Sequence, residues 1–82
     1  MDTPHDILYT MGETAVKHLA KGNPTATVTE WAGDIYISLT MVSMFTGIWL
    51  IGIPTGGSLP FETGDIQAAE RELTRLMERM QV

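Results

Sequence analysis

The 82-residue sequence has no cysteine, and its five lysines and arginines stand against ten acidic residues, for a net charge of −5. The absence of cysteine excludes disulfides and cysteine-ligated zinc, which commonly support very small domains. The shortage of basic residues argues against a nucleic-acid binder, because such a protein needs a basic face to displace counterions from phosphate. We therefore expect no nucleic-acid partner.

Catalytic and metal-binding motifs are also missing. The chain has no cysteine nucleophile and no G-x-S-x-G motif, and its carboxylates are scattered. His5 and His18 lie too far apart on one predicted helix to share a metal ion without other ligands. The glycines at 56–57 could offer backbone N–H groups to an anion, but the Lys-Ser/Thr pair of a P-loop is absent. We expect a non-enzyme without cofactor or metal, and we leave ligand binding by this loop open.

Residues 35–53, "IYISLTMVSMFTGIWLIGI", contain no charged side chain. Roughly 20 such residues can cross a bilayer as a helix, and Tyr36 and Trp49 sit where interfacial aromatic residues would. Two observations argue against a membrane span. No lysine or arginine lies near either end of the segment, and apolar residues recur at every second position over residues 35–41. We favour buried strands and keep a span as the alternative.

The ends of the chain predict two helices that flank these strands. Thr3 can cap a helix that starts at Pro4, and Lys21 with Gly22 ends it, so we expect a helix over residues 4–21. Thr63 can introduce a closing helix. Its narrow apolar stripe consists of Ile66, Ala69, Leu73, Leu76, Met77 and Met80.

Between the helices, alternation predicts strands. Residues 25–31 and 35–41 alternate on either side of a turn at Gly33, which indicates a hairpin. "MFTG" predicts a second turn, and residues 48–53 are apolar on both faces, as in a strand that is covered on both sides. The predicted fold is α+β, with a helix, a three-stranded antiparallel meander and a closing helix (α-β-β-β-α). It forms one domain over residues 1–82.

Two surface features indicate protein partners. Arg71, Arg75 and Arg79 are spaced to form one basic line on the closing helix, which can meet an acidic or phosphate-bearing partner or can simply be solvated. Trp31 is either a core anchor or an exposed interface residue. We assign all four residues to partner binding.

Self-association is expected because a chain this short buries only about 60% of its unfolded surface and is marginal alone. A copy of itself can cover the second face of the strand at 48–53, and Gly12 beside Ala15 permits a close helix crossing. The predicted self-interface comprises Met11, Gly12, Ala15, Ile48 and Ile51.

The order of elements over residues 4–80 resembles the later part of the roadblock/LC7 domain. "TVTEWAGDIYISL" looks like its first hairpin, "GIWLIGIPTGG" like its last strand and loop, and "DIQAAERELTRLM" like its closing helix. Counterparts of that family's opening helix and two strands are not found among the 82 residues. The resemblance implies a non-enzymatic homodimer, and a small GTPase or a larger complex as partner.

These features together predict a self-associating regulatory or scaffolding module. The N-terminal "MDTPHDILYT" is acidic and lacks the features of a signal peptide, so we expect a cytoplasmic protein. One alternative is a small single-pass, membrane-associated subunit with residues 35–53 as its span. A phage-type inhibitor or a ligand-sequestering oligomer is a further alternative.

Overall fold

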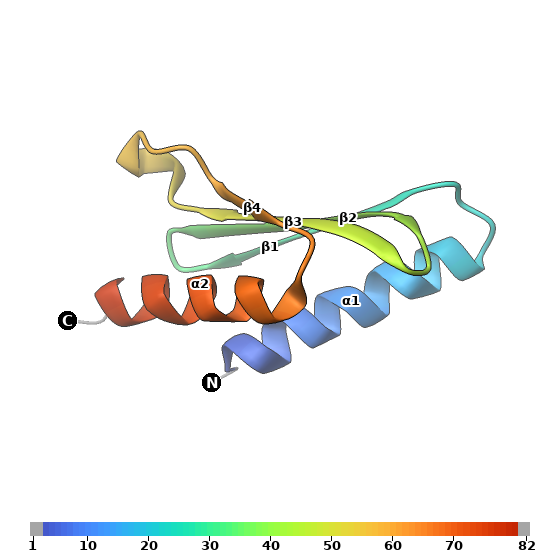
Figure 1. The fold of residues 1–82 in the computed structure, drawn as a ribbon, viewed down its shortest axis with the longest axis horizontal. Coiled ribbons are helices and arrows are strands. Elements are labelled where there is room, and N and C mark those ends of the chain that lie inside the picture. Colours follow the sequence, from blue (N-terminus) through green and yellow to red (C-terminus); the bar gives the residue numbers. More distant parts are fainter. Residues whose placement is uncertain (1–2, 81–82) are drawn as a thin grey trace.

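A computed structural model describes residues 3–80, which form one four-stranded antiparallel sheet with both helices on the same face (Figure 1). The class is α+β, as the sequence predicts. The elements in chain order are α1 (Pro4–Ala20), β1 (Ala26–Ala32), β2 (Ile35–Ser43), β3 (Thr46–Gly52), a 3₁₀ turn (Pro54–Gly56), β4 (Phe61–Thr63) and α2 (Ile66–Met80).

Helix α1 begins and ends where its sequence signals lie. The hydroxyl of Thr3 accepts a hydrogen bond of 3.1 Å from the backbone N–H of Asp6, which satisfies one of the free donors of the first turn. At the other end Gly22 takes a φ of 98°, which reverses the chain without a Cβ clash. The side-chain amide of Asn23 then donates to the carbonyl oxygen of His18 at 2.8 Å. The helix ends one residue earlier than predicted, because Lys21 is its C-cap.

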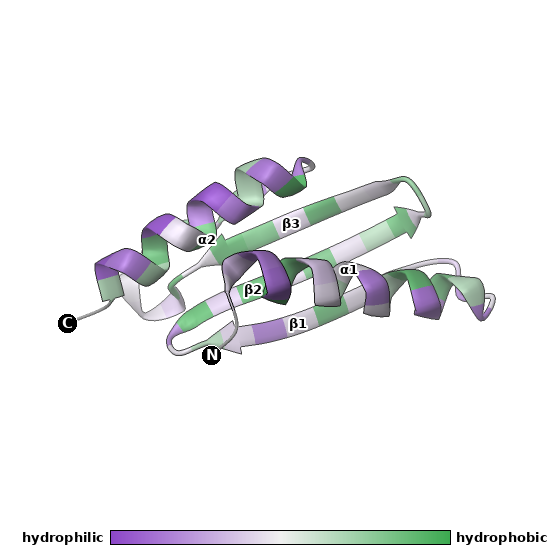
Figure 2. Cartoon of the chain, turned by 90° about the horizontal axis from the view of Figure 1, so that it is seen from below, coloured by the Kyte–Doolittle hydropathy of each residue, from purple (hydrophilic) through white to green (hydrophobic). Residues whose placement is uncertain are grey.

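The two predicted hairpins are confirmed. Strands β1 and β2 pair through a turn in which Gly33 adopts a φ of 63°, and β2 and β3 pair through the turn at Met44 and Phe45. The strands neighbour one another in chain order, β1-β2-β3-β4. Figure 2 shows the sheet from the helix side, with α1 over β1 and β2 and α2 along β3.

The fourth strand was not predicted, so the expected three-stranded meander has one strand too few. Strand β4 is only three residues long, and it pairs with β3 through Ile51 opposite Phe61 and Trp49 opposite Thr63. Residues 61–63, which precede the closing helix, therefore return to the sheet before α2 begins. This return places the beginning of α2 directly beside β3.

Residues 35–53, which the sequence offers as a candidate membrane span, fold back on themselves as β2 and β3. Within residues 3–80, neither helix has the length and apolarity that crossing a bilayer requires. The apolar character of this segment instead serves the core, where alternate side chains face the two helices.

The core lies between the sheet and the helices and has only one layer. Apolar side chains of the sheet, mainly of β2 and β3, form one side of the core, and those of α1 and α2 form the other. The expectation that β3 is covered on both faces is not met within one chain, because both helices lie on the same side. The core comprises Leu8, Met11, Ala15, Ala26, Ile35, Ile37, Leu39, Met41, Trp49, Ile51, Ala69, Leu73 and Leu76.

Candidate functional site

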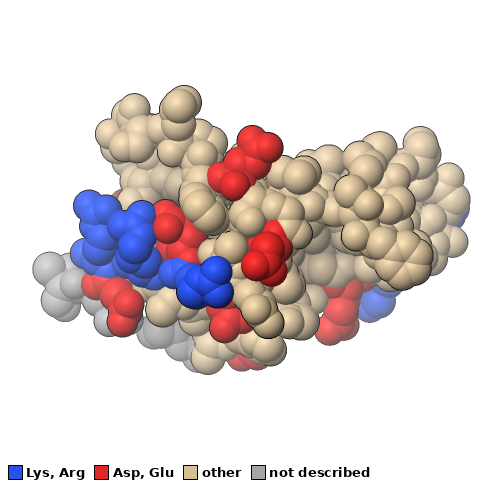
Figure 3. Space-filling view, viewed as in Figure 1, with Lys and Arg blue, Asp and Glu red and all other residues tan. Residues whose placement is uncertain are grey.

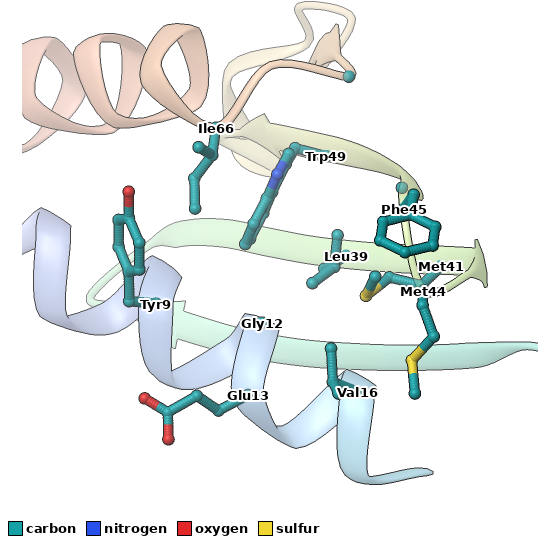
Figure 4. Close-up of a pocket in the computed structure, with 12 residues that line it drawn as sticks. Tyr9, Gly12, Glu13, Val16, Leu39, Met41, Met44, Phe45, Trp49 and Ile66 are labelled. Carbon is teal, nitrogen blue, oxygen red and sulfur yellow. The ribbon is translucent and has the colours of Figure 1, made fainter. Parts of the chain in front are cut away.

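An apolar groove, which we call the hairpin groove, lies between α1, the end of the β2–β3 hairpin and the start of α2 (Figure 4). Its volume is about 360 Å³, within the range of about 300–1,000 Å³ that is common for binding pockets. Among the described residues that line it, Glu13 alone carries a charge. The lining comprises Tyr9, Gly12, Glu13, Val16, Leu39, Met41, Met44, Phe45, Gly47, Trp49, Gly64 and Ile66.

Phe45 stands at the rim of this groove and is 97% exposed. Its backbone N–H donates to the hydroxyl of Ser43 at 3.2 Å, so the turn that presents the ring is held by a local hydrogen bond. Met44, beside it, and Tyr9 and Val16, on α1, are also exposed. A cluster of exposed apolar side chains of this kind marks an interaction surface more often than a free one.

Gly12 leaves the wall of the groove that α1 forms without a side chain. A Cβ built at Gly12 would have no neighbouring atom within 4 Å, so the helix crossing that the sequence predicts beside Ala15 is not made within the chain. One contact that does join the two helices is that between His5 and Glu70. The missing side chain at Gly12 contributes open space to the groove.

The structure divides the predicted self-interface. Met11, Ala15 and Ile51 are buried in the core of the single chain, so a second copy cannot contact them without unfolding the first. Ile48, on the opposite face of β3 from Ile51, is 40% exposed, and Gly12 lines the hairpin groove. Only these two of the five predicted positions remain accessible to a partner.

The three arginines lie on α2 as predicted, and each of them is exposed. Arg75 is held by Glu72: its Nε and Nη2 atoms donate to the two carboxylate oxygens at 3.0 and 2.6 Å. This hydrogen bonding, together with the attraction of the carboxylate charge, raises the pKa of Arg75 above its ordinary value. Figure 3 shows most of the basic side chains on this face gathered over α2, with acidic side chains beside them. Glu72 and Arg75 are three positions apart on α2, a spacing at which an ion pair supports a helix.

A second groove, which we call the arginine groove, separates α2 from the loop at residues 54–60. Its volume is about 570 Å³. Arg75, Arg79 and Glu72 line it from α2, and the side chains of the facing wall are apolar apart from Ser58. That wall includes Leu59, which is 93% exposed although it is a large apolar residue. Of the loop glycines at 56–57, Gly56 lines the groove and Gly57 adopts a φ of 74°.

Trp31 is not a core anchor, since 59% of it is exposed. It pairs with Tyr36 across β1 and β2, and the two rings meet edge to face with their centroids 5.2 Å apart. The register places both rings on the sheet face opposite the helices. Trp31 and the arginines therefore belong to opposite layers of the molecule and do not form one partner surface.

Residues 3–80 contain no cluster of three His, Cys, Asp or Glu side chains that could hold a metal ion. His5 stacks on Tyr9 with a centroid distance of 4.1 Å and contacts Glu70, so a structural contact accounts for its place in the fold.

The sequence did not single out Phe45, Met44 or Leu59 as surface residues. Their residue type could have identified them, because turns and loops seldom need large apolar side chains.

No protein-family model, no curated protein and no solved structure matches this chain. The resemblance to the roadblock/LC7 domain therefore rests on the order of the elements alone.

Proposed function

We propose that the protein is a non-enzymatic, self-associating interaction module that forms a two-fold dimer through the hairpin groove. In this dimer Phe45 of each copy occupies the groove of the other. The observation that carries the proposal is the position of Phe45, which is 97% exposed at the rim of an apolar groove of about 360 Å³. The free energy falls when a large, exposed aromatic side chain enters an apolar groove, because apolar surface on both is removed from water.

A second copy suits this surface because the ring and the groove lie side by side on one chain. A two-fold axis near the hairpin end brings both pairs together at once and closes the assembly at two copies. Charge also favours the arrangement. The chain carries a net charge of −5, so two copies repel each other over most orientations. Glu13 is the one charged residue among the described groove residues, and its carboxylate points away from the apolar side chains in Figure 4.

The regulatory or scaffolding role in this proposal belongs to the opposite end of the molecule. The hairpin turn and the end of α2 lie toward opposite ends of the long axis (Figure 1), so a dimer formed at the hairpin leaves Arg71, Arg75 and Arg79 accessible. Two such basic lines in one dimer can hold an acidic partner with greater avidity than one. The resemblance to a family of non-enzymatic dimers supports the same role.

Filling the groove from within tests the proposal. Gly12→Leu places a side chain where a Cβ meets no atom within 4 Å, and leucine also favours the helix, so the variant should fold. It should be monomeric, as should Phe45→Asp, whereas wild type should sediment at twice the 9.0 kDa chain mass at micromolar concentration. Leu59→Asp, an equally exposed apolar site away from the hairpin groove, serves as the control and should stay dimeric.

Circular dichroism of each variant should match that of wild type, which separates loss of the dimer from loss of the fold. A wild-type monomer at tens of micromolar would refute self-association. A dimer that survives both Gly12→Leu and Phe45→Asp would remove the hairpin groove from the interface and leave the open sheet face around Ile48 to be tested.

A further inference from the structure

The arginine groove combines an apolar wall with a small excess of positive charge. Ile53, Leu59 and Phe61 line one side, and Leu76 lines the side formed by α2. The charged residues that line it are Arg75, Arg79 and Glu72, which leaves one net positive charge on a chain whose total charge is −5. We propose that this groove binds a small amphiphile with one carboxylate and one aliphatic chain, with the carboxylate on Arg79 and the chain along the apolar wall.

The head of the ligand is assigned to Arg79 because the other guanidinium is already engaged. Arg75 directs two of its donors at Glu72, at 3.0 and 2.6 Å, and this pair neutralises itself. Arg79 lies one helical turn further on, and within residues 3–80 it forms no ion pair. Its planar set of donors matches the two oxygens of a carboxylate, which is the strongest common pairing for arginine.

The tail is assigned to the loop side because of the exposure of Leu59. This side chain is 93% exposed, whereas Ile53, which also lines the groove, is partly buried against the core. An aliphatic chain laid between Leu59 and Leu76 removes apolar surface from water on both walls and on itself. A groove of about 570 Å³ has the size of a small-molecule site.

The number of charges distinguishes this ligand from other anions. Inorganic phosphate or a nucleotide brings, on average, more than one negative charge near neutral pH to a site with one positive charge in excess, and Glu72 would repel the surplus. Inorganic phosphate would also leave the apolar wall uncovered. A monoanion with a tail satisfies both halves of the groove. This site shares no lining residue with the hairpin groove, so its occupation goes beyond the proposed dimer and does not depend on it.

The test is an NMR titration of the 82-residue chain, labelled at its methyl groups, with decanoate below its micelle concentration. The methyl signals of Ile53, Leu59 and Leu76 should shift and saturate. Decanol, which has the same chain and no charge, should bind about tenfold more weakly, because it cannot form the charge-assisted pair. Decyltrimethylammonium, with the opposite charge, should bind no better than decanol.

Substitutions then assign the head and the tail separately. Arg79→Met should weaken decanoate binding about tenfold and leave decanol binding unchanged. Arg71→Met removes the same charge from the same helix outside the groove and should change neither. Leu59→Ser should weaken both ligands, which shows that the tail lies on the loop. Arg79 and Leu59 are both exposed, so these variants should keep the wild-type spectrum.

Three results would overturn the proposal. Equal affinity for decanoate and decanol would remove the role of Arg79. Shifts at Val16 and Met44 would place the ligand in the hairpin groove. Binding to phosphatidylglycerol vesicles without binding to monomeric decanoate would assign the arginines to a membrane surface. Sedimentation reports on the dimer separately, so each of these results can be interpreted whether or not the dimer forms.

Discussion

The Nδ1 atom of His5 lies 3.0 Å from the Oε1 atom of Glu70, and this contact joins the first turn of α1 to α2 across 65 positions of the chain. His5 also stacks on Tyr9, so its ring is held from a second side. Both partners of the contact are partly exposed. The pair therefore fixes how the two helices meet at one end of the core, with water still able to reach it.

A double-mutant cycle on His5→Ala and Glu70→Ala should give a coupling free energy of about 0.2–1 kcal/mol, because exposed pairs are screened and cost side-chain entropy. The measurement is urea unfolding of wild type, both single variants and the double variant. The coupling should shrink in 1 M salt, where the Debye length falls to about 3 Å. A coupling of several kcal/mol would mean that the pair is far less solvated than its exposure indicates.

Ile48 and Ile51 form a matched pair on β3, since they point to opposite faces and only Ile51 is fully buried. Ile51→Asp should unfold the chain, because an unpaired charge in the core costs several kcal/mol. Ile48→Asp should fold, with a loss of about 1 kcal/mol or less. Thermal unfolding followed by circular dichroism distinguishes the two. A folded, monomeric Ile51→Asp variant would instead support the sequence-based assignment of Ile51 to a self-interface.

The turn between β1 and β2 depends on Gly33, whose φ of 63° lies in the left-handed region. Gly33→Ala should lower the free energy of unfolding by about 1–2 kcal/mol, because a Cβ is strained in that region. Gly33→Asn should lose less, since asparagine tolerates the left-handed region. A denaturant midpoint that is the same for all three proteins would show that the turn relaxes at no cost.

The cap of α1 can be tested at one atom. Thr3→Ala removes the hydroxyl that accepts from the N–H of Asp6 at 3.1 Å, and it should cost about 1 kcal/mol. Thr3→Ser keeps an acceptor in the same place and should stay within a few tenths of a kcal/mol of wild type. Equal losses in the two variants would attribute the effect to the threonine methyl group.

Local signals predicted most of the fold. The cap at Thr3, the stop at Gly22 and the turn at Gly33 each depend on a few adjacent residues, and the structure has all three. Strand β4 was missed because three residues are too few to show a period of two. Its pairing partner Trp49 lies 14 positions before Thr63, and no local pattern connects them.

The candidate surfaces were harder to predict, for a different physical reason. Apolar residues on both faces of β3 fit a strand with two covers, and they also fit one face packed and one face open. Only the placement of both helices on one side decides between them. Met11 and Ala15 carry the same ambiguity, because a helix stripe looks alike whether it packs on its own sheet or on a second copy.

The chain-order arrangement of the sheet also has a kinetic consequence. Each strand pairs with its neighbour in sequence, so the hairpins can form early, whereas the contact between α1 and α2 must close most of the chain. Contacts that close late are absent from the transition state, and their loss mainly speeds unfolding. We therefore expect His5→Ala to raise the unfolding rate with little effect on refolding, and Gly33→Ala, in the first hairpin, to slow refolding instead.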